Sequence, residues 1–408
     1  GFAYSTPLPL ILEGWVSFFV FFLHNRIMNI LQEIFTDHYE EIKYTLHPRP
    51  AEMENIDKMI NCGDPSFGGA MYVCTTCHNM KFVPFHCKSR FCPTCGVKYS
   101  QERSTSMAFK LVNCTHRHCV FTIDEKLRHF FLEDRSLLNC LFRAVQSVIL
   151  HMFNKINKSQ NFVPGFICVL HTFGRPLEWN PHIHCILSEG GFSGNAIWRP
   201  VKHFNYTYLR NAFQTALLNE MEQHIGPSFK KIKAYIYHKD KNGFYVYAKP
   251  NLCDPNTVIK YIGRYLGRPV IALKRIDSYD GENVTFHYNR HEDNAYVKRT
   301  IPAIEFIKLL IQHIPEKHFK MIRYYGLYAR HREIDTKLYR AIHKSKHRFI
   351  KSFTKWRQDI LLSFGYDPLF CPHCKKEMAL VEVYYRHKWV SLQELYERTM
   401  AKVKFRSA

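Results

Sequence analysis

The stretch Asn180-Pro181-His182-Ile183-His184-Cys185-Ile186-Leu187 places two histidines two residues apart within an apolar run. Side chains at positions i and i+2 of a β-strand share one face, so His182 and His184 lie on the same side and Ile183 on the other. The run therefore predicts a strand over residues 182–187. Its paired imidazoles suit a transition ion such as Mn²⁺ or Zn²⁺, whereas Mg²⁺ prefers oxygen ligands. Polar residues on a solvated strand face are the alternative interpretation.

A third metal ligand is expected from the strand that precedes this one. That strand is predicted over residues 166–173, and it carries His171 eleven positions before His182. The segment between them is rich in Gly and Pro, which favours a turn. An antiparallel hairpin would bring His171 beside the histidine pair and complete a three-imidazole site. Glu178 or Asn180 could supply the third ligand instead.

Two tyrosines follow in the tandem run Tyr261-Ile-Gly-Arg-Tyr265-Leu-Gly-Arg268. A helix is predicted over residues 255–268, and tyrosines at i and i+4 lie on one helical face. The adjacent stripe is cationic and comprises Lys260, Arg264 and Arg268. A phenol has a pKa near 10, and neighbouring cations would ease its attack on a phosphate. The alternative is an ordinary Tyr/Gly packing face with a solvated basic edge.

The charge of the chain points to a polyanionic partner. Its 408 residues contain 57 Lys and Arg against 35 Asp and Glu, a formal net charge of +22. Nucleic acid is the first candidate, and an anionic membrane surface is the second. A hydrophobic content of 46% is typical of a folded protein, and the length allows two or three domains with cores of their own.

The fourteen cysteines have the spacing of metal ligands and not of a disulfide framework. Cys74 and Cys77 form one Cys-x-x-Cys pair, and Cys92 and Cys95 form another, which together predict a zinc-ribbon-like site. The remaining cysteines of this segment, Cys62 and Cys87, leave room for a second site together with His78 and His86. Cys371 and Cys374 resemble half of a further zinc site whose other ligands the sequence does not reveal. This usage favours a reducing cytosol.

Other elements are predicted from periodicity and turn residues. Helices are expected over residues 28–60 with a break at 48–50, and over 206–224 and 303–314. A strand is expected over 118–123, followed by a long amphipathic helix. Residues 234–237 and 244–247 are expected to be the strands of a hairpin around Asp240-Lys-Asn-Gly243.

The first 27 residues precede the first methionine, Met28, and include the apolar stretch Trp15–Leu23. That stretch is shorter than the roughly 20 residues that a spanning helix needs, and it lacks the features of a signal peptide. We expect translation to begin naturally at Met28, with residues 1–27 as an upstream extension. A weak interfacial anchor is the alternative.

In this order the motifs resemble those of the two-tyrosine HUH transposases of rolling-circle insertion sequences, the insertion sequence ninety-one family. The resemblance covers residues 30–380 and rests on the cysteine segment, the histidine and tyrosine motifs, and later segments. Those residues read Cys74-Thr-Thr-Cys77, Cys87-Lys-Ser-Arg-Phe-Cys92-Pro-Thr-Cys95, His118-Cys-Val-Phe-Thr, His171-Thr-Phe-Gly, Asn180-Pro-His-Ile-His184, Tyr261-Ile-Gly-Arg-Tyr265, Ile322-Arg-Tyr-Tyr-Gly326 and Phe370-Cys-Pro-His-Cys374.

The resemblance implies an α+β fold with a central antiparallel sheet of the HUH-endonuclease kind and flanking helices. A zinc-binding domain would occupy residues 28–100 and the catalytic domain residues 110–300. A basic, mainly helical DNA-binding region would occupy residues 301–408. The implied location is the bacterial cytoplasm, where the protein acts at the nucleoid, with no membrane partner.

The resemblance also implies the reaction. Tyr261 or Tyr265 would attack a phosphate of single-stranded DNA at transposon ends and targets, giving a 5′-phosphotyrosine and a free 3′-hydroxyl. Mg²⁺ or Mn²⁺ would be the catalytic ion, bound by His182 and His184, and structural Zn²⁺ would bind the cysteines. Conservation of bond energy in the phosphotyrosine removes the need for a nucleotide cofactor, and the sequence has no Gly-x-x-x-x-Gly-Lys-Ser/Thr loop.

Two other functions remain open. A replication initiator or plasmid relaxase would share the chemistry and differ in its DNA target, although the cysteine-rich segment favours a transposase. A zinc-dependent nucleic-acid-binding protein without enzymatic activity would keep the cysteines and the charge. Such a protein would have no use for a His-x-His strand with paired tyrosines.

Overall fold

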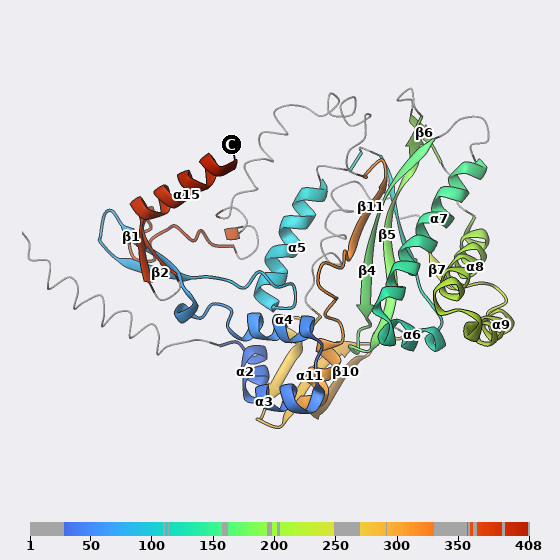
Figure 1. Cartoon of the computed structure of the whole chain (residues 1–408), viewed down its shortest axis with the longest axis horizontal. Helices are drawn as coiled ribbons and strands as arrows, with labels where there is room; N and C mark the ends of the chain where they lie inside the picture. Colours follow the sequence, from blue (N-terminus) through green and yellow to red (C-terminus); the bar gives the residue numbers. More distant parts are fainter. Residues whose placement is uncertain are drawn as a thin grey trace, which may run out of the picture.

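A computed structural model of the chain describes its folded elements (Figure 1). The described residues are 28–108, 111–112, 114–156, 162–193, 198–201, 205–248, 270–290, 292–329, 357, 360–361, 365–385 and 388–406. The tyrosine segment with Tyr261 and Tyr265, its cations Lys260, Arg264 and Arg268, and the extension 1–27 lie outside these residues.

A central antiparallel sheet with the strand order β11-β4-β5-β3-β7 forms the body of the molecule, and a short strand, β6, pairs with β5. The predicted strands around the histidines are confirmed, and β4 and β5 form a long hairpin. The bounds are β3 (His116–Phe121), β4 (Val163–Phe173), β5 (Trp179–Phe192), β6 (Trp198–Pro200), β7 (Val246–Tyr247) and β11 (Ile322–Gly326).

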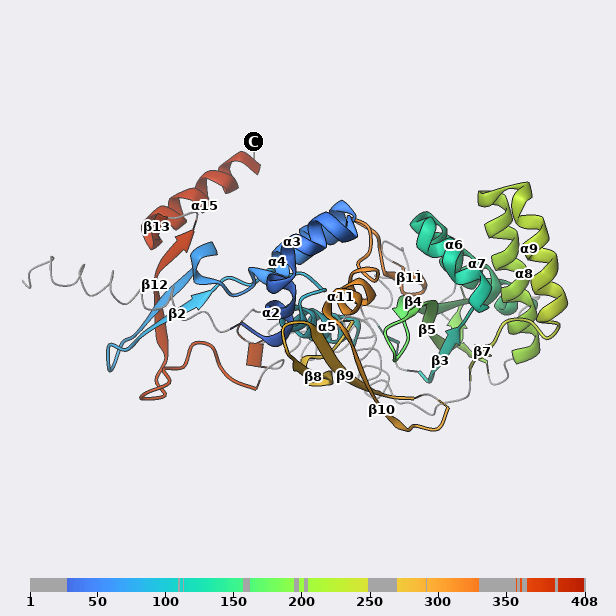
Figure 2. The same cartoon turned by 90° about the horizontal axis from the view of Figure 1, so that it is seen from below.

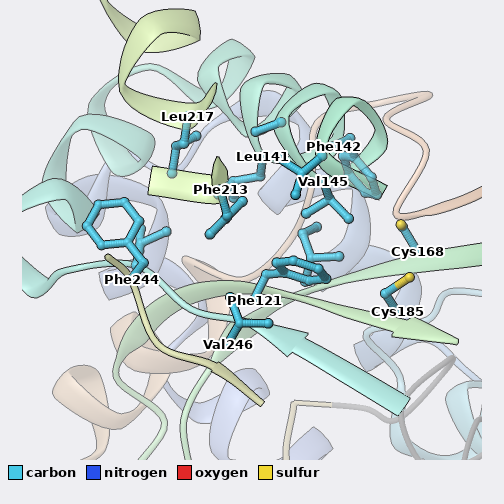
Figure 3. Close-up of a cluster of buried hydrophobic side chains, with 14 of the residues drawn as sticks. Phe121, Leu141, Phe142, Val145, Cys168, Cys185, Phe213, Leu217, Phe244 and Val246 are labelled. Carbon is cyan, nitrogen blue, oxygen red and sulfur yellow. The ribbon is translucent and has the colours of Figure 1, made fainter. Parts of the chain in front are cut away.

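Two long helices, α7 (Leu138–Ile156) and α8 (Tyr206–Ile225), cover one face of this sheet and confirm two helix predictions. Figure 3 shows their apolar side chains, such as Leu141 and Phe213, against Phe121 and Cys185 of the strands. Residues alternate along a strand, so the neighbours of Ile183 and Cys185, namely the histidines of β5, lie on the opposite face. The core therefore fixes which face the histidines occupy.

The stretch Arg135–Lys155, which contains most of helix α7, has the length and composition of a membrane span. However, 61% of that stretch is buried inside the fold. The apolar surface of α7 packs on the sheet and on α8, so its composition is explained by the core.

A second unit combines the cysteine-rich segment with the end of the described chain. The hairpin of β1 (Gly69–Cys74) and β2 (Met80–Pro84) belongs to a sheet of order β13-β12-β1-β2. Strands β12 (Met378–Tyr385) and β13 (Lys388–Ser391) come from the C-terminal region, as Figures 1 and 2 show. Helix α15 (Leu392–Arg406) follows them.

Between these two units lies a third sheet with its own helices. Strands β8 (Ile276–Tyr279), β9 (Asn283–Asn289) and β10 (Tyr296–Pro302) pack with helix α11 (Ala303–Ile311), which confirms the predicted apolar helix in this region. Their core is shared with the N-terminal helices and with Cys92 and Cys95. The helices of the N-terminal segment are α2 (Ile30–Asp37), α3 (Tyr39–Glu41), α4 (Pro50–Ile60) and α5 (Pro93–Ala108).

Two shorter helices complete the layer beside the central sheet, α6 (Arg128–Glu133) and α9 (Lys230–Lys239). The predicted hairpin at 234–247 is wrong in its first half, because residues 230–239 form α9. Phe229 and Ile236 are buried in the core that contains α8, and this packing overrides the β propensity of the Tyr-Ile-Tyr run. The predicted turn remains, since the N–H of Gly243 donates to the carbonyl of Asp240 over 3.0 Å.

The prediction of a mainly helical C-terminal region is also wrong for the described residues, where β11, β12 and β13 outnumber the long helices. Strand β12 contains the alternating, β-forming run Val381-Glu-Val-Tyr-Tyr385 and finds its partner in β1, about 300 positions earlier. Most of the basic tract between 317 and 357 lies outside the described residues.

Candidate metal centres

Three histidines converge near the turn of the β4–β5 hairpin. The register pairs His171 with His182 and Val169 with His184, so the predicted third histidine lies beside the predicted pair. Their ring nitrogens all lie within 4.8 Å of one another, and the Nε2 atoms of His182 and His184 are 3.1 Å apart. Nitrogens bound at 2.0–2.1 Å to one ion stand about 3.0–3.4 Å apart. The donor set therefore fits a single metal ion.

The tautomer of His182 favours the same conclusion. Its Nδ1 lies 2.7 Å from the carbonyl oxygen of Asn180, so Nδ1 carries the proton and donates it, and the Nε2 lone pair faces His184. Burial lowers the pKa of His182 and lowers that of His184 further. Both rings are thereby held in the neutral form that binds metals.

The two alternatives for the third ligand differ in the structure. Glu178 is exposed and does not belong to the cluster of donor atoms. Asn180 precedes the histidines on β5, where the register with β4 is irregular, and its Oδ1 is buried without a hydrogen-bond partner among the described residues. An orphaned buried oxygen two residues before His182 is a candidate additional ligand for an ion that prefers oxygen.

A fourth histidine, His118 of β3, contacts the cluster from the neighbouring strand. Its Nε2 lies 2.9 Å from Nδ1 of His184, and the two rings stack with centroids 5.2 Å apart. Burial lowers the pKa of His118 to about 4. This contact occupies Nδ1 of His184 and leaves its Nε2 for a metal. Sequence reasoning placed His118 on a strand but missed its role, because only the pairing of β3 with β5 brings it there.

The cysteines form two groups of four within the described part of the chain. One contains Cys62, Cys87, Cys92 and Cys95, with Sγ distances of 3.6 Å between Cys87 and Cys95 and 3.7 Å between Cys62 and Cys95. The other contains Cys74, Cys77, Cys371 and Cys374. Four thiolates suit Zn²⁺ in a closed, structural site.

The predicted grouping of Cys74 and Cys77 with Cys92 and Cys95 is therefore wrong. Hairpin β1–β2 carries the first pair toward β12, while the chain after β2 returns to the end of α4, where Cys62 lies. His86 stays close to the first group, with Nδ1 3.6 Å from Sγ of Cys62. Cys371 and Cys374, which had no predicted partners, find them in Cys74 and Cys77.

A further cluster of Cys140, Glu220 and His224 already contains a cation. The guanidinium of Arg143 lies 2.6 Å from Glu220, 3.0 Å from His224 and 3.4 Å from Cys140. This cluster is an ion-pair network between α7 and α8.

Comparisons with known proteins agree with both kinds of centre. A family model described as "Putative transposase" matches residues 165–335, which include the β4–β5 hairpin and both tyrosines. A second model, "Transposase zinc-binding domain", matches residues 34–123, which include the first cysteine group and the Cys74/Cys77 pair. No solved structure matches the chain.

Two curated relatives extend the likeness over most of the chain. The transposase for insertion sequence element IS801 of Pseudomonas savastanoi pv. phaseolicola is 29% identical over 296 residues, covering 69% of this chain and 71% of the relative. "Putative transposase y4qJ" of Sinorhizobium fredii is 28% identical over 293 residues, covering 67% and 73%.

The histidine cluster, the cysteine groups and the relatives together define a transposase with a zinc-binding domain, a class of protein that acts on DNA. Within that class, the chain belongs to the two-tyrosine IS91 family with an N-terminal zinc-binding domain.

Proposed function

We propose that the protein nicks and rejoins single-stranded DNA through Tyr261 and Tyr265, with a divalent ion bound by His171, His182 and His184. The observation that carries this proposal is the convergence of three imidazoles near the turn of the β4–β5 hairpin. An ion bound there would act as a Lewis acid that withdraws charge from the scissile phosphate. Mg²⁺ and Mn²⁺ are the candidates, and the oxygen of Asn180 suits either.

Each step of the reaction replaces one ester bond to phosphorus by another, so the number of phosphodiester bonds does not change. The phenol oxygen of one tyrosine attacks phosphorus and loses its proton, while the bond from phosphorus to the 3′ oxygen breaks. The 3′ oxygen leaves and gains a proton, so the products are a 5′-phosphotyrosine and a 3′-hydroxyl. Attack by a 3′-hydroxyl on the phosphotyrosine reverses these changes and rejoins DNA. Two tyrosines allow two such transfers, one for each strand end, as in rolling-circle transposition.

The proposal is tested with the full chain and a set of single-stranded oligonucleotides in Mg²⁺ or Mn²⁺. We expect a covalent protein–DNA adduct that survives denaturation and depends on the metal ion. Binding without any adduct across origin-like and transposon-end sequences would favour the zinc-dependent binding protein instead. An adduct formed only on replication-origin sequences would favour an initiator or relaxase.

The route of the DNA is supported by a cavity of about 1100 Å³ between helices α4 and α5 and the central sheet. Its wall includes α4, α5 and the edge strand β11, and His171 of the metal cluster also lines it. Seven Lys or Arg residues line the cavity against two Glu residues, so its field attracts phosphates. Val270, which follows the tyrosine segment, lines it as well.

Exposed lysines of this cavity are expected to bind the DNA backbone. The variant Lys88→Gln/Lys317→Gln/Lys320→Gln removes three exposed charges at its rim. We expect affinity for single-stranded DNA to fall at least tenfold at low salt. The slope of log affinity against log salt should become shallower by about 0.7 for each phosphate that the variant no longer neutralises. Fluorescence anisotropy of a labelled oligonucleotide measures both.

A matched control removes the same charge elsewhere. Lys230→Gln/Lys231→Gln/Lys241→Gln changes three exposed lysines on and after α9, away from the cavity. It should leave the salt dependence near that of the unmodified chain. Equal slopes for the two variants would exclude the cavity as the DNA route.

His118 is expected to position His184 for the metal. Its replacement in His118→Ala should weaken Mn²⁺ binding by about 10- to 100-fold, the range for residues that orient a ligand. Because a glutamine oxygen can accept the Nδ1 proton of His184, His118→Gln should recover part of the affinity. Isothermal titration with Mn²⁺ in the absence of DNA measures this. Unchanged Mn²⁺ affinity in His118→Ala would show that the contact serves packing alone.

A further inference from the structure

The same turn is built twice at the two ends of the described chain, once at Cys74-Thr-Thr-Cys77-His78 and once at Cys371-Pro-His-Cys374-Lys375. In each turn the residue after the second cysteine has a positive φ, 54° at His78 and 60° at Lys375. The N–H of that residue donates to the carbonyl of the first cysteine over 3.0 Å in both turns. Residues other than Gly rarely adopt this conformation. Its presence after both cysteine pairs indicates that the two turns have the same structural role.

The likeness of the two turns extends to the hydrogen bonds on either side of the first cysteine. The N–H of Cys74 donates to the carbonyl of Asn79 over 2.9 Å, and the N–H of Cys371 donates to that of Lys376 over 2.8 Å. The two turns are therefore alike in their backbone hydrogen bonds as well as in their φ angles.

The two turns face each other with their sulfurs together. Sγ of Cys74 lies 3.4 Å from that of Cys374, and Sγ of Cys77 lies 3.5 Å from that of Cys371. These separations exceed the length of a disulfide and approach the roughly 3.8 Å edge of a tetrahedron with 2.3 Å metal–sulfur bonds. Cys74 and Cys371 are fully buried.

Few apolar side chains hold these elements together. The buried apolar cluster beside the four cysteines consists of Cys74, Cys371 and Met378, with Tyr72 and Cys374 packed against it. Elsewhere in the same sheet, Met71, Phe82 and Val390 are also buried. The sheet pairing of β12 with β1 starts at Met378 opposite Cys74. A unit with so small a core needs another source of stability, and a structural metal is one.

We propose that one Zn²⁺, bound by Cys74, Cys77, Cys371 and Cys374, joins the β1–β2 hairpin to the C-terminal part of the chain and holds β12 and β13 on that hairpin. Cys77 and Cys371 are 294 positions apart, so the ion closes the whole catalytic region into a loop. The family model for the zinc-binding domain ends at residue 123 and does not include the second pair. The site would stand whether or not the tyrosines attack DNA.

Zinc stoichiometry of the purified full chain, measured by elemental analysis, tests the proposal. We expect two ions per chain, and one in either Cys74→Ser/Cys77→Ser or Cys371→Ser/Cys374→Ser. The quadruple variant with both pairs replaced should also retain one ion, because the pairs share a single site. Loss of a second ion in the quadruple variant, or two ions retained in Cys371→Ser/Cys374→Ser, would overturn the proposal.

Two control variants and a hydrogen-exchange measurement separate a missing site from a failure to fold. Cys114→Ser/Cys140→Ser, which changes cysteines outside both groups, should keep two ions. In Cys371→Ser/Cys374→Ser, hydrogen exchange should accelerate in β1 and β12 while β4 and β5 stay protected. Cys371→His, which preserves a zinc ligand, should keep both the second ion and the protection. Protection of β12 that persists without the second ion would show that the metal does not hold the strands.

Discussion

The variant Tyr261→Phe/Tyr265→Phe is expected to form no covalent adduct with single-stranded DNA, a loss of at least about a thousandfold in nicking rate. Phenylalanine keeps the ring and its packing but removes the oxygen that attacks phosphorus, so binding should persist while chemistry stops. Denaturing gel electrophoresis of a labelled oligonucleotide measures the adduct, and anisotropy measures the binding.

The single variants show which of the two strand transfers each tyrosine performs. If each tyrosine performs one transfer, Tyr261→Phe and Tyr265→Phe should each retain one step, and the retained steps should differ. Tyr235→Phe/Tyr237→Phe serves as the control, because both of these side chains are exposed on α9. An adduct that persists at the normal level in the double variant at 261 and 265 would remove the tyrosine mechanism.

The variant His171→Ala is expected to lower the affinity for Mn²⁺ by at least about a hundredfold, because it removes a ligand and not merely a residue that orients one. Metal-dependent nicking should fall by a similar or larger factor. Titration calorimetry in the absence of DNA gives the affinity, and a nicking assay over a range of Mn²⁺ concentrations gives the activity. The remaining pair, His182 and His184, should still bind the ion weakly, so high Mn²⁺ should restore part of the activity.

His129→Ala is the matched control, since His129 is exposed on α6 and lies outside the cluster. Normal metal-dependent nicking in His171→Ala would show that His171 is not a metal ligand and would leave Asn180 as the candidate third ligand. The variant Asn180→Ala then distinguishes the two, because it removes a buried side-chain oxygen that has no hydrogen-bond partner among the described residues.

Elements specified by neighbouring residues were predictable. Apolar runs located the strands of the β4–β5 hairpin, helical periodicity located α7 and α11, and the Gly- and Pro-rich turn between His171 and His182 predicted their pairing. Helix α9 was not predictable in this way, because its β-forming residues adopt the helix that buries Ile236. Local propensity contributes less there than tertiary burial.

The sequence by itself determined which functional groups are present. These are three histidines on adjoining strands, an excess of cationic side chains, two tyrosines in tandem and cysteines with the spacing of metal ligands. Only the tertiary structure decided which of these residues meet. His118 faces His184 across 66 positions, and Cys371 meets Cys77 across 294. Spacing along the chain specifies partners within one turn or hairpin, whereas partners from distant elements are selected by the packing of sheets. That packing depends on the whole core and not on any local pattern.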